Sequence, residues 1–149
     1  MSTSPRPIEI LLVEDNPGDV ELTREALEEG KVRNMLHVAR DGEEALAYLR
    51  NEAPDRPRPD LVLLDLNLPK VDGHEVLRQM KEDPTLRAIP VVVLTTSESA
   101  TDIARSYEHH ASAFVSKPVS LEDFIRTVQS LESFWLTVVR YPPRRTSQP

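Results

Sequence analysis

Apolar residues along this chain fall into short, mostly continuous runs, separated by stretches in which they recur every three or four positions. The runs span residues 8–13, 35–39, 61–64, 91–95 and 113–116. Each run is too short for an ordinary helix and is bounded by turn-forming residues, which is typical of strands buried on both faces. The pattern therefore predicts five strands.

Helical signals follow each predicted strand. Asn16 is placed to cap a first helix that has Pro17 at its first position, and Asp41 and Glu44 have the spacing of a capping box. The predicted helices cover about residues 17–27, 41–50, 73–81, 97–109 and 120–139. Because each parallel crossover needs such a connection, the alternation predicts an α/β fold with an open parallel sheet and helices on both faces.

Polar residues stand where four of the predicted strands end. Glu14 and Asp15 follow the first strand, Asp65 follows the third, Thr95 ends the fourth and Lys117 follows the fifth. In an open parallel sheet these ends lie along one edge, and ligands bind there. We therefore expect the five side chains to form one site.

Three carboxylates at one edge repel one another strongly unless a cation neutralises them. Mg²⁺ prefers oxygen ligands and retains several waters, so Asp15, Asp65, the backbone carbonyl of Asn67 and a water-bridged Glu14 suit it better than they suit zinc. We therefore predict Mg²⁺ as the cofactor. The four histidines share no ligand spacing with an open metal site and are interpreted as surface or packing residues.

Composition narrows the possible functions. Eighteen basic and twenty-five acidic residues give a net charge of -7, and without a basic cluster direct nucleic-acid binding is disfavoured. The absence of cysteine excludes disulfides and thiolate metal sites and suits a reducing cytosol. The apolar runs are far shorter than the ~18 residues of a membrane span, and residues 1–7 do not resemble a secretory signal. We expect a cytoplasmic protein with no nucleic-acid or membrane partner.

Four motifs give the chain a family resemblance. They are Leu-Val-Glu-Asp-Asn at 12–16, Leu-Leu-Asp-Leu-Asn-Leu-Pro at 63–69 with Asp-Gly at 72–73, Leu-Thr-Thr at 94–96, and Ser-Lys-Pro at 116–118. In this order, on these strands, they resemble the response-regulator receiver domains of two-component signalling. The resemblance implies a (βα)5 flavodoxin-like, doubly wound five-stranded sheet with an extended C-terminal helix. The receiver domain would span 8–139, with flexible ends at 1–7 and 140–149.

The resemblance also implies a reaction. Asp65 would accept a phosphoryl group from a phosphohistidine or a small acyl phosphate, while Mg²⁺ and the Lys117 ammonium hold the phosphoryl oxygens. Thr95 would turn its hydroxyl onto the phosphoryl group, and Phe114 would fill the space vacated by the loop. The protein would then be a phosphoacceptor and not an enzyme, apart from self-catalysed phosphotransfer and autodephosphorylation.

Simpler interpretations are available for the same residues. Asp65 could cap a helix, the acidic pair could be a solvated helix start, and Lys117 could be a surface cation, with Thr95 and Phe114 as ordinary strand and core residues. Two rival functions also differ in sequence. A metal-dependent phosphohydrolase has Asp-x-Asp after its first strand, where this chain has Glu-Asp-Asn. A binding module without phosphorylation usually lacks an acidic residue, the Thr or the Lys.

Thr96 stands where many receivers have Ala or Gly, so the lifetime of the phosphoryl group stays open.

The carboxyl-terminal residues suggest how a signal leaves the protein. Residues 118–149 suffice for a helix and a tail but not for a separate output domain, so we expect output by protein–protein interaction. An apolar stripe that includes Phe134, Trp135 and Val138 predicts a homodimer; the alternative is that this segment folds back onto its own domain. The ending is similar to that of stand-alone regulators paired with bacterial phytochromes, which implies a light-sensing histidine kinase as partner.

Overall fold

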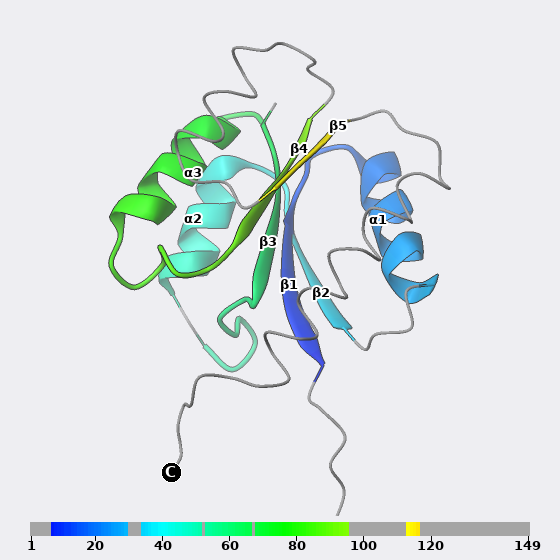
Figure 1. Cartoon of the computed structure of the whole chain (residues 1–149), viewed down its shortest axis with the longest axis horizontal. Coiled ribbons are helices and arrows are strands. Elements are labelled where there is room, and N and C mark those ends of the chain that lie inside the picture. Colours follow the sequence, from blue (N-terminus) through cyan, green and yellow to red (C-terminus); the bar gives the residue numbers. More distant parts are fainter. Residues whose placement is uncertain (1–6, 30–33, 52, 67, 96–112, 117–149) are drawn as a thin grey trace, which may run out of the picture.

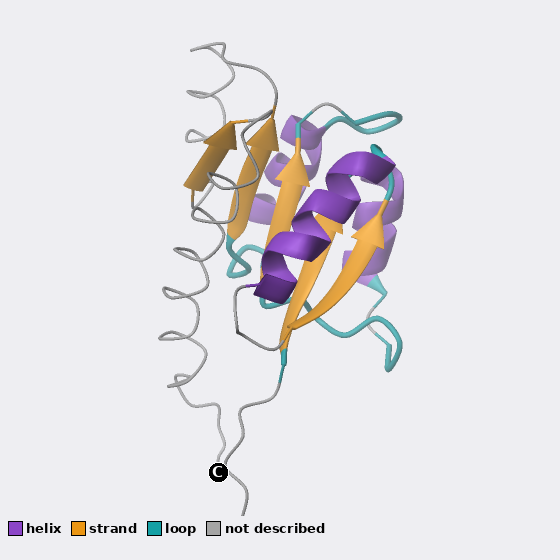
Figure 2. Cartoon of the chain, turned by 90° about the vertical axis from the view of Figure 1, so that its right-hand side faces the viewer, coloured by secondary structure: helices purple, strands orange, loops and turns teal. Residues whose placement is uncertain are grey.

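The strands form a single parallel sheet. The computed structural model describes residues 7–29, 34–51, 53–66, 68–95 and 113–116. Its strands are β1 (Ile8–Val13), β2 (Asn34–Ala39), β3 (Leu61–Asp65), β4 (Val91–Thr95) and β5 (Ala113–Ser116). They pair in the order β2-β1-β3-β4-β5, every neighbouring pair is parallel, and all the arrows in Figure 2 point the same way. The predicted parallel α/β architecture is confirmed.

Helices cover both faces of this sheet. On one side lies α1 (Pro17–Glu29), and on the other lie α2 (Gly42–Arg50) and α3 (Gly73–Glu82), as Figure 1 shows. Alternate residues of each central strand serve the two layers, because successive side chains of a strand point to opposite faces. In β1, Ile10 and Leu12 pack with the α1 layer, whereas Leu11 and Val13 pack with the α2 and α3 layer.

Two of the predicted helices, at 97–109 and 120–139, lie outside the described residues. The same holds for Phe134, Trp135 and Val138, for residues 1–6 and for the predicted tail at 140–149. In the part of the chain that is described, no helix combines the length and the apolar character needed to cross a bilayer.

The predicted caps hold the helices at the carboxyl edge of the sheet. Asn16 Oδ1 accepts a hydrogen bond from Asp19 N at 3.1 Å, and Asp41 Oδ1 accepts one from Glu44 N at 2.7 Å. Asp72 caps α3 in the same way, accepting from Glu75 N at 2.9 Å. Each carboxylate or amide satisfies a backbone donor that a helix start leaves unpaired.

A half-buried lysine closes the connection from α3 to β4. Lys81 Nζ donates to the carbonyl oxygens of Arg87 at 3.1 Å and Ile89 at 2.9 Å. Burial lowers the pKa of this ammonium group. The two hydrogen bonds hold the turn that leads the chain into β4. They therefore help to set the residue at which β4 begins to pair in the sheet.

The start of α2 packs directly against the backbone of the loop after β3. A Cβ atom added to Gly42 would lie 1.9 Å from the carbonyl oxygen of Val71. That separation is far inside van der Waals contact, and the obstacle is backbone, which cannot rotate away. By contrast, a Cβ on Gly18 in α1 would meet only the side-chain oxygen of Asn16, at 3.2 Å.

Gly42→Ala is therefore expected to destabilise the fold by about 1–3 kcal/mol, the usual cost of overpacking. Gly18→Ala is the matched control and should leave stability unchanged or raise it by up to about 1 kcal/mol, because alanine favours helix. Urea denaturation of both variants measures the difference. Equal stabilities would show that α2 does not need this close approach.

Candidate functional site

Asp65 is the last residue of β3, in the middle of the sheet. It pairs in register with Leu94 of β4, and the following amide, Leu66 N, donates to Leu94 O at 3.2 Å. Only 4% of Asp65 is exposed. Pairing with β4 therefore fixes the backbone of Asp65, which lies at the carboxyl edge as predicted.

Glu14 and Asp15 leave the neighbouring strand at the same edge. Glu14 N donates to Ala39 O of β2 at 2.9 Å, which extends the β1–β2 pairing by one residue. Its carboxylate accepts a hydrogen bond from Asn16 N at 3.2 Å and is buried, with the residue 1% exposed. Asp15 is exposed. The acidic pair thus offers one fixed carboxylate and one at the solvent surface.

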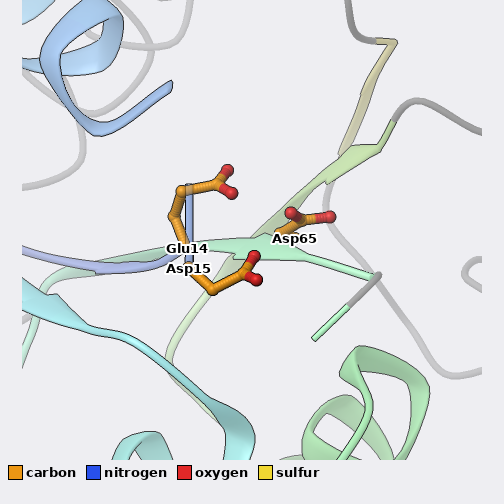
Figure 3. A group of neighbouring side chains, drawn as sticks. All are labelled: Glu14, Asp15 and Asp65. Atoms are coloured by element: carbon orange, nitrogen blue, oxygen red, sulfur yellow. The ribbon is translucent and has the colours of Figure 1, made fainter. Parts of the chain in front are cut away.

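The structure brings these three acidic residues together. Glu14, Asp15 and Asp65 each contribute one carboxylate oxygen to a group whose members lie within 4.8 Å of one another. Figure 3 shows the side chains gathered where β1 and β3 end. An all-oxygen donor set with one solvent-facing member suits a hard divalent cation that keeps some of its waters. The residues present therefore fit a magnesium-type site.

The remaining predicted site residues are described only in part. Thr95 ends β4 and Phe114 lies in β5, where it pairs in register with Val93, but the side chains of both residues lie outside the description. Asn67 and Lys117 also lie outside the described residues. Their proposed roles stay predictions.

The described histidines are separate from the carboxylate group. His37 Nε2 lies 2.7 Å from Glu9 Oε1, on β2 and β1 respectively, and His74 is buried at the start of α3. Neither belongs to the three-residue group. For these two residues the structure agrees with the expectation of surface or packing roles.

The loop after Asp65 folds back tightly on the end of β3. Gly73 N donates to Leu66 O at 3.0 Å, and a Cβ on Gly73 would lie 2.5 Å from both Asp65 O and Leu66 Cα. Glycine is thus required where α3 begins, because any side chain would displace the backbone of Asp65. The sequence contains the Asp-Gly pair, but only the fold shows which backbone atoms it approaches.

Known proteins resemble this chain over most of its length. The family described as "Response regulator receiver domain" matches residues 10–129. Response regulator Rcp1 from Synechocystis sp. is 47% identical over 138 residues, covering 91% of this chain and 94% of the relative. The crystal structure of its Mn(2+)-bound form superposes with a TM-score of 0.79 at 43% identity, covering 96% and 99% of the two chains.

Two further relatives are named for different processes. The phosphorylated cyanobacterial phytochrome response regulator RcpA has a TM-score of 0.81 and 48% identity, covering 89% of this chain and 96% of that structure. The probable methanogenesis regulatory protein FilR2 from Methanothrix harundinacea is 50% identical over 137 residues, covering 91% and 88%. Relatives of similar identity to this chain are therefore named for different processes.

Repulsion within the carboxylate group gives a testable prediction. Asp15→Asn should make the metal-free protein more stable by about 1 kcal/mol, the Coulomb energy of two unit charges about 4 Å apart in water. Added Mg²⁺ should reverse the order, because wild type gains about 2.7 kcal/mol when the ion is at 100 times its Kd, whereas the variant gains less.

Urea denaturation with EDTA and with Mg²⁺ measures both effects. Glu28→Gln, which removes an exposed carboxylate from α1, is the control and should respond to Mg²⁺ as wild type does. If Asp15→Asn gains as much from Mg²⁺ as wild type does, Asp15 is not a ligand.

Proposed function

Because this chain belongs to the response regulator receiver family, we propose that Asp65 is the residue on which it accepts a phosphoryl group. The observation that supports this most directly is the placement of Asp65 at the end of β3, within 4.8 Å of carboxylate oxygens from Glu14 and Asp15. The rival phosphohydrolase would carry its nucleophile after β1. In this chain the carboxylate at the centre of the sheet edge belongs to β3.

The proposed reaction moves a phosphoryl group from nitrogen to oxygen. A carboxylate oxygen of Asp65 forms a bond to phosphorus while the nitrogen–phosphorus bond of a phosphohistidine breaks, and the imidazole leaves with the electron pair. Lys117 would hold a phosphoryl oxygen as a point charge, and the Thr95 hydroxyl would hydrogen-bond another. Transfer onto Asp65 and later hydrolysis would be promoted by the receiver itself.

We propose Mg²⁺ as the cation, held by Glu14, Asp15, Asp65 and the backbone carbonyl of Asn67. Support comes from the all-oxygen donor set and from the Mn(2+)-bound structure of Rcp1. When bound, such a cation neutralises carboxylate and phosphoryl charge. The chain's own part is to hold the three carboxylates close together in a buried frame.

Asp65→Asn should abolish phosphorylation, because an amide nitrogen or oxygen does not replace the carboxylate nucleophile. Incubation with acetyl phosphate and Mg²⁺, followed by intact mass measurement, should show one phosphoryl group on wild type and none on the variant. Asp55→Asn, at an exposed carboxylate beside Arg56, is the matched control and should be phosphorylated normally. Turnover of the donor without a stable adduct would favour the phosphohydrolase instead.

We propose a sensor histidine kinase of the phytochrome type as the phosphoryl donor in the cell, and a cytoplasmic location. The similarity to RcpA, a phytochrome response regulator, supports this partner, whereas FilR2 is named for a different process. The mass assay tests this partner when a phosphorylated phytochrome kinase replaces acetyl phosphate as the donor. Transfer within seconds would support the partner, and transfer no faster than from an unrelated kinase would contradict it.

Output is proposed to occur through protein contacts made by a receiver domain that spans residues 8–139. On phosphorylation, Thr95 would move toward the phosphoryl group and Phe114 would change position with it. The apolar stripe with Phe134, Trp135 and Val138 is proposed to form the interface of a homodimer. This proposal rests on the sequence pattern of residues 120–139.

Replacing Phe134 and Trp135 by alanine should convert a dimer into a monomer, because large aromatic side chains supply most of the binding free energy in such interfaces. Light scattering measures the mass of wild type and variant at the same concentration. Leu22→Ala, at an exposed apolar residue of α1, serves as the control and should leave the mass unchanged. A dimer that survives the double substitution would place the interface elsewhere.

A further inference from the structure

The loop that follows Asp65 is tied to the start of α2 by contacts that the proposed reaction does not use. Lys70 Nζ lies 3.7 Å from Asp41 Oδ2 and 3.6 Å from Glu43 Oε1. The next residue of the loop, Val71, has its carbonyl against Gly42, where a Cβ atom would come within 1.9 Å. A side-chain ion pair and a backbone contact thus join the same two segments.

The backbone at Lys70 is held in an unusual conformation. Its φ angle is 67°, and among the described residues it is the non-glycine position with a positive φ. This left-handed conformation brings Cβ close to the following carbonyl, so it is costly for residues other than Gly, Asn and Asp. Such a conformation persists only where surrounding contacts enforce it. The contacts around Lys70 are the two ion pairs to α2 and the close approach of the next residue's carbonyl to Gly42.

The same loop starts at Asp65, the proposed phosphoacceptor. It begins directly after Asp65, contains the proposed metal ligand Asn67, and ends at Gly73, whose amide donates to Leu66 O at 3.0 Å. The two ends of the loop are therefore tied to each other beside β3, and its middle, at Lys70, is tied to the start of α2. A change at either attachment alters the path available to the residues between them.

We infer that Lys70 is a positioning residue: its ion pairs with Asp41 and Glu43 hold the loop after Asp65 in the conformation that binds the divalent cation. The part of this inference that concerns the cation rests on the proposed function. The mechanical part, that Lys70 restrains the loop, does not depend on it. The two parts can therefore be measured separately.

A purely electrostatic role and a positioning role for Lys70 predict opposite changes in Mg²⁺ affinity when the charge is removed. A positive charge on the loop that follows Asp65 opposes the binding of a cation beside Asp65, so removing the Lys70 charge should tighten Mg²⁺ binding if Lys70 acts only through its field. If Lys70 acts by restraining the loop, the same removal should weaken binding. The sign of the change decides between the two.

Lys70→Asn is the informative substitution, because asparagine tolerates a positive φ but carries no charge. Hydrogen exchange of the Gly73 amide in the metal-free protein reports on the loop, and calorimetric titration with Mg²⁺ reports on the site. Exchange should accelerate and the Kd should rise by about two- to fivefold, the range expected from losing exposed ion pairs. Lys70→Arg should restore both values.

Two further variants complete the design. Glu43→Gln removes the other half of an ion pair, and it should accelerate Gly73 exchange to a similar extent. Arg24→Gln removes an exposed cation that pairs with Glu21 on α1, and it should leave Gly73 exchange unchanged. Faster exchange in Arg24→Gln would indicate a general effect of charge.

Each result has a distinct meaning. Unchanged exchange in Lys70→Asn, or tighter Mg²⁺ binding, would overturn the positioning role. If wild type itself binds no Mg²⁺, the proposed function fails, while faster Gly73 exchange would still support the restraint on the loop. Faster exchange together with weaker binding, both restored by arginine, is the result that the inference requires.

Discussion

The structure depends on holding three like-charged side chains at one edge of a sheet. Two unit charges about 4 Å apart repel by about 1 kcal/mol even in water, and by more where burial lowers the dielectric constant. The opposing free energy comes from the apolar strands that carry them. Residues 10–13 of β1 and 61–64 of β3 are buried, and their side chains divide between two packed layers. Because a close-packed interior resists displacement, Glu14 and Asp65 cannot separate without disturbing that core.

This arrangement explains why the three carboxylates are not equivalent. Glu14 and Asp65 are buried and anchored by backbone pairing to Ala39 and Leu94, whereas Asp15 is exposed. Two fixed oxygens define a position, and the third remains accessible from solvent. A cation that enters from water thus finds part of its coordination already arranged, and the free energy of its binding is not spent on ordering the chain.

Much of this could be predicted from the sequence because the signals are local. The strand runs, the caps at Asn16 and Asp41, and the meeting of Glu14, Asp15 and Asp65 follow from apolar runs, cap spacing and the geometry of parallel sheets. The β2-β1-β3 order and the close approach of Gly42 to Val71 could not be predicted in this way, because they depend on how distant segments meet. The positive φ of Lys70 has no sequence signal, since lysine is not a residue that favours it. The roles of Asn67, Thr95, Phe114 and Lys117 stay predictions.

The packed strands alone cannot transmit a change at Asp65, because a close-packed core has one arrangement. The loop after Asp65 differs from the strands because exposed contacts to α2 hold its middle. The side chain of Lys70 is 62% exposed, and that of Glu43 is 71% exposed. Contacts of this kind contribute little free energy and are exchanged easily, in contrast to the buried strands. A phosphoryl group on Asp65, as proposed, would add charge where the loop begins, and the weakly held contacts at Lys70 are where the loop can move. Among the described surfaces, the start of α2 is therefore where a change at Asp65 would alter the structure with the smallest loss of stability.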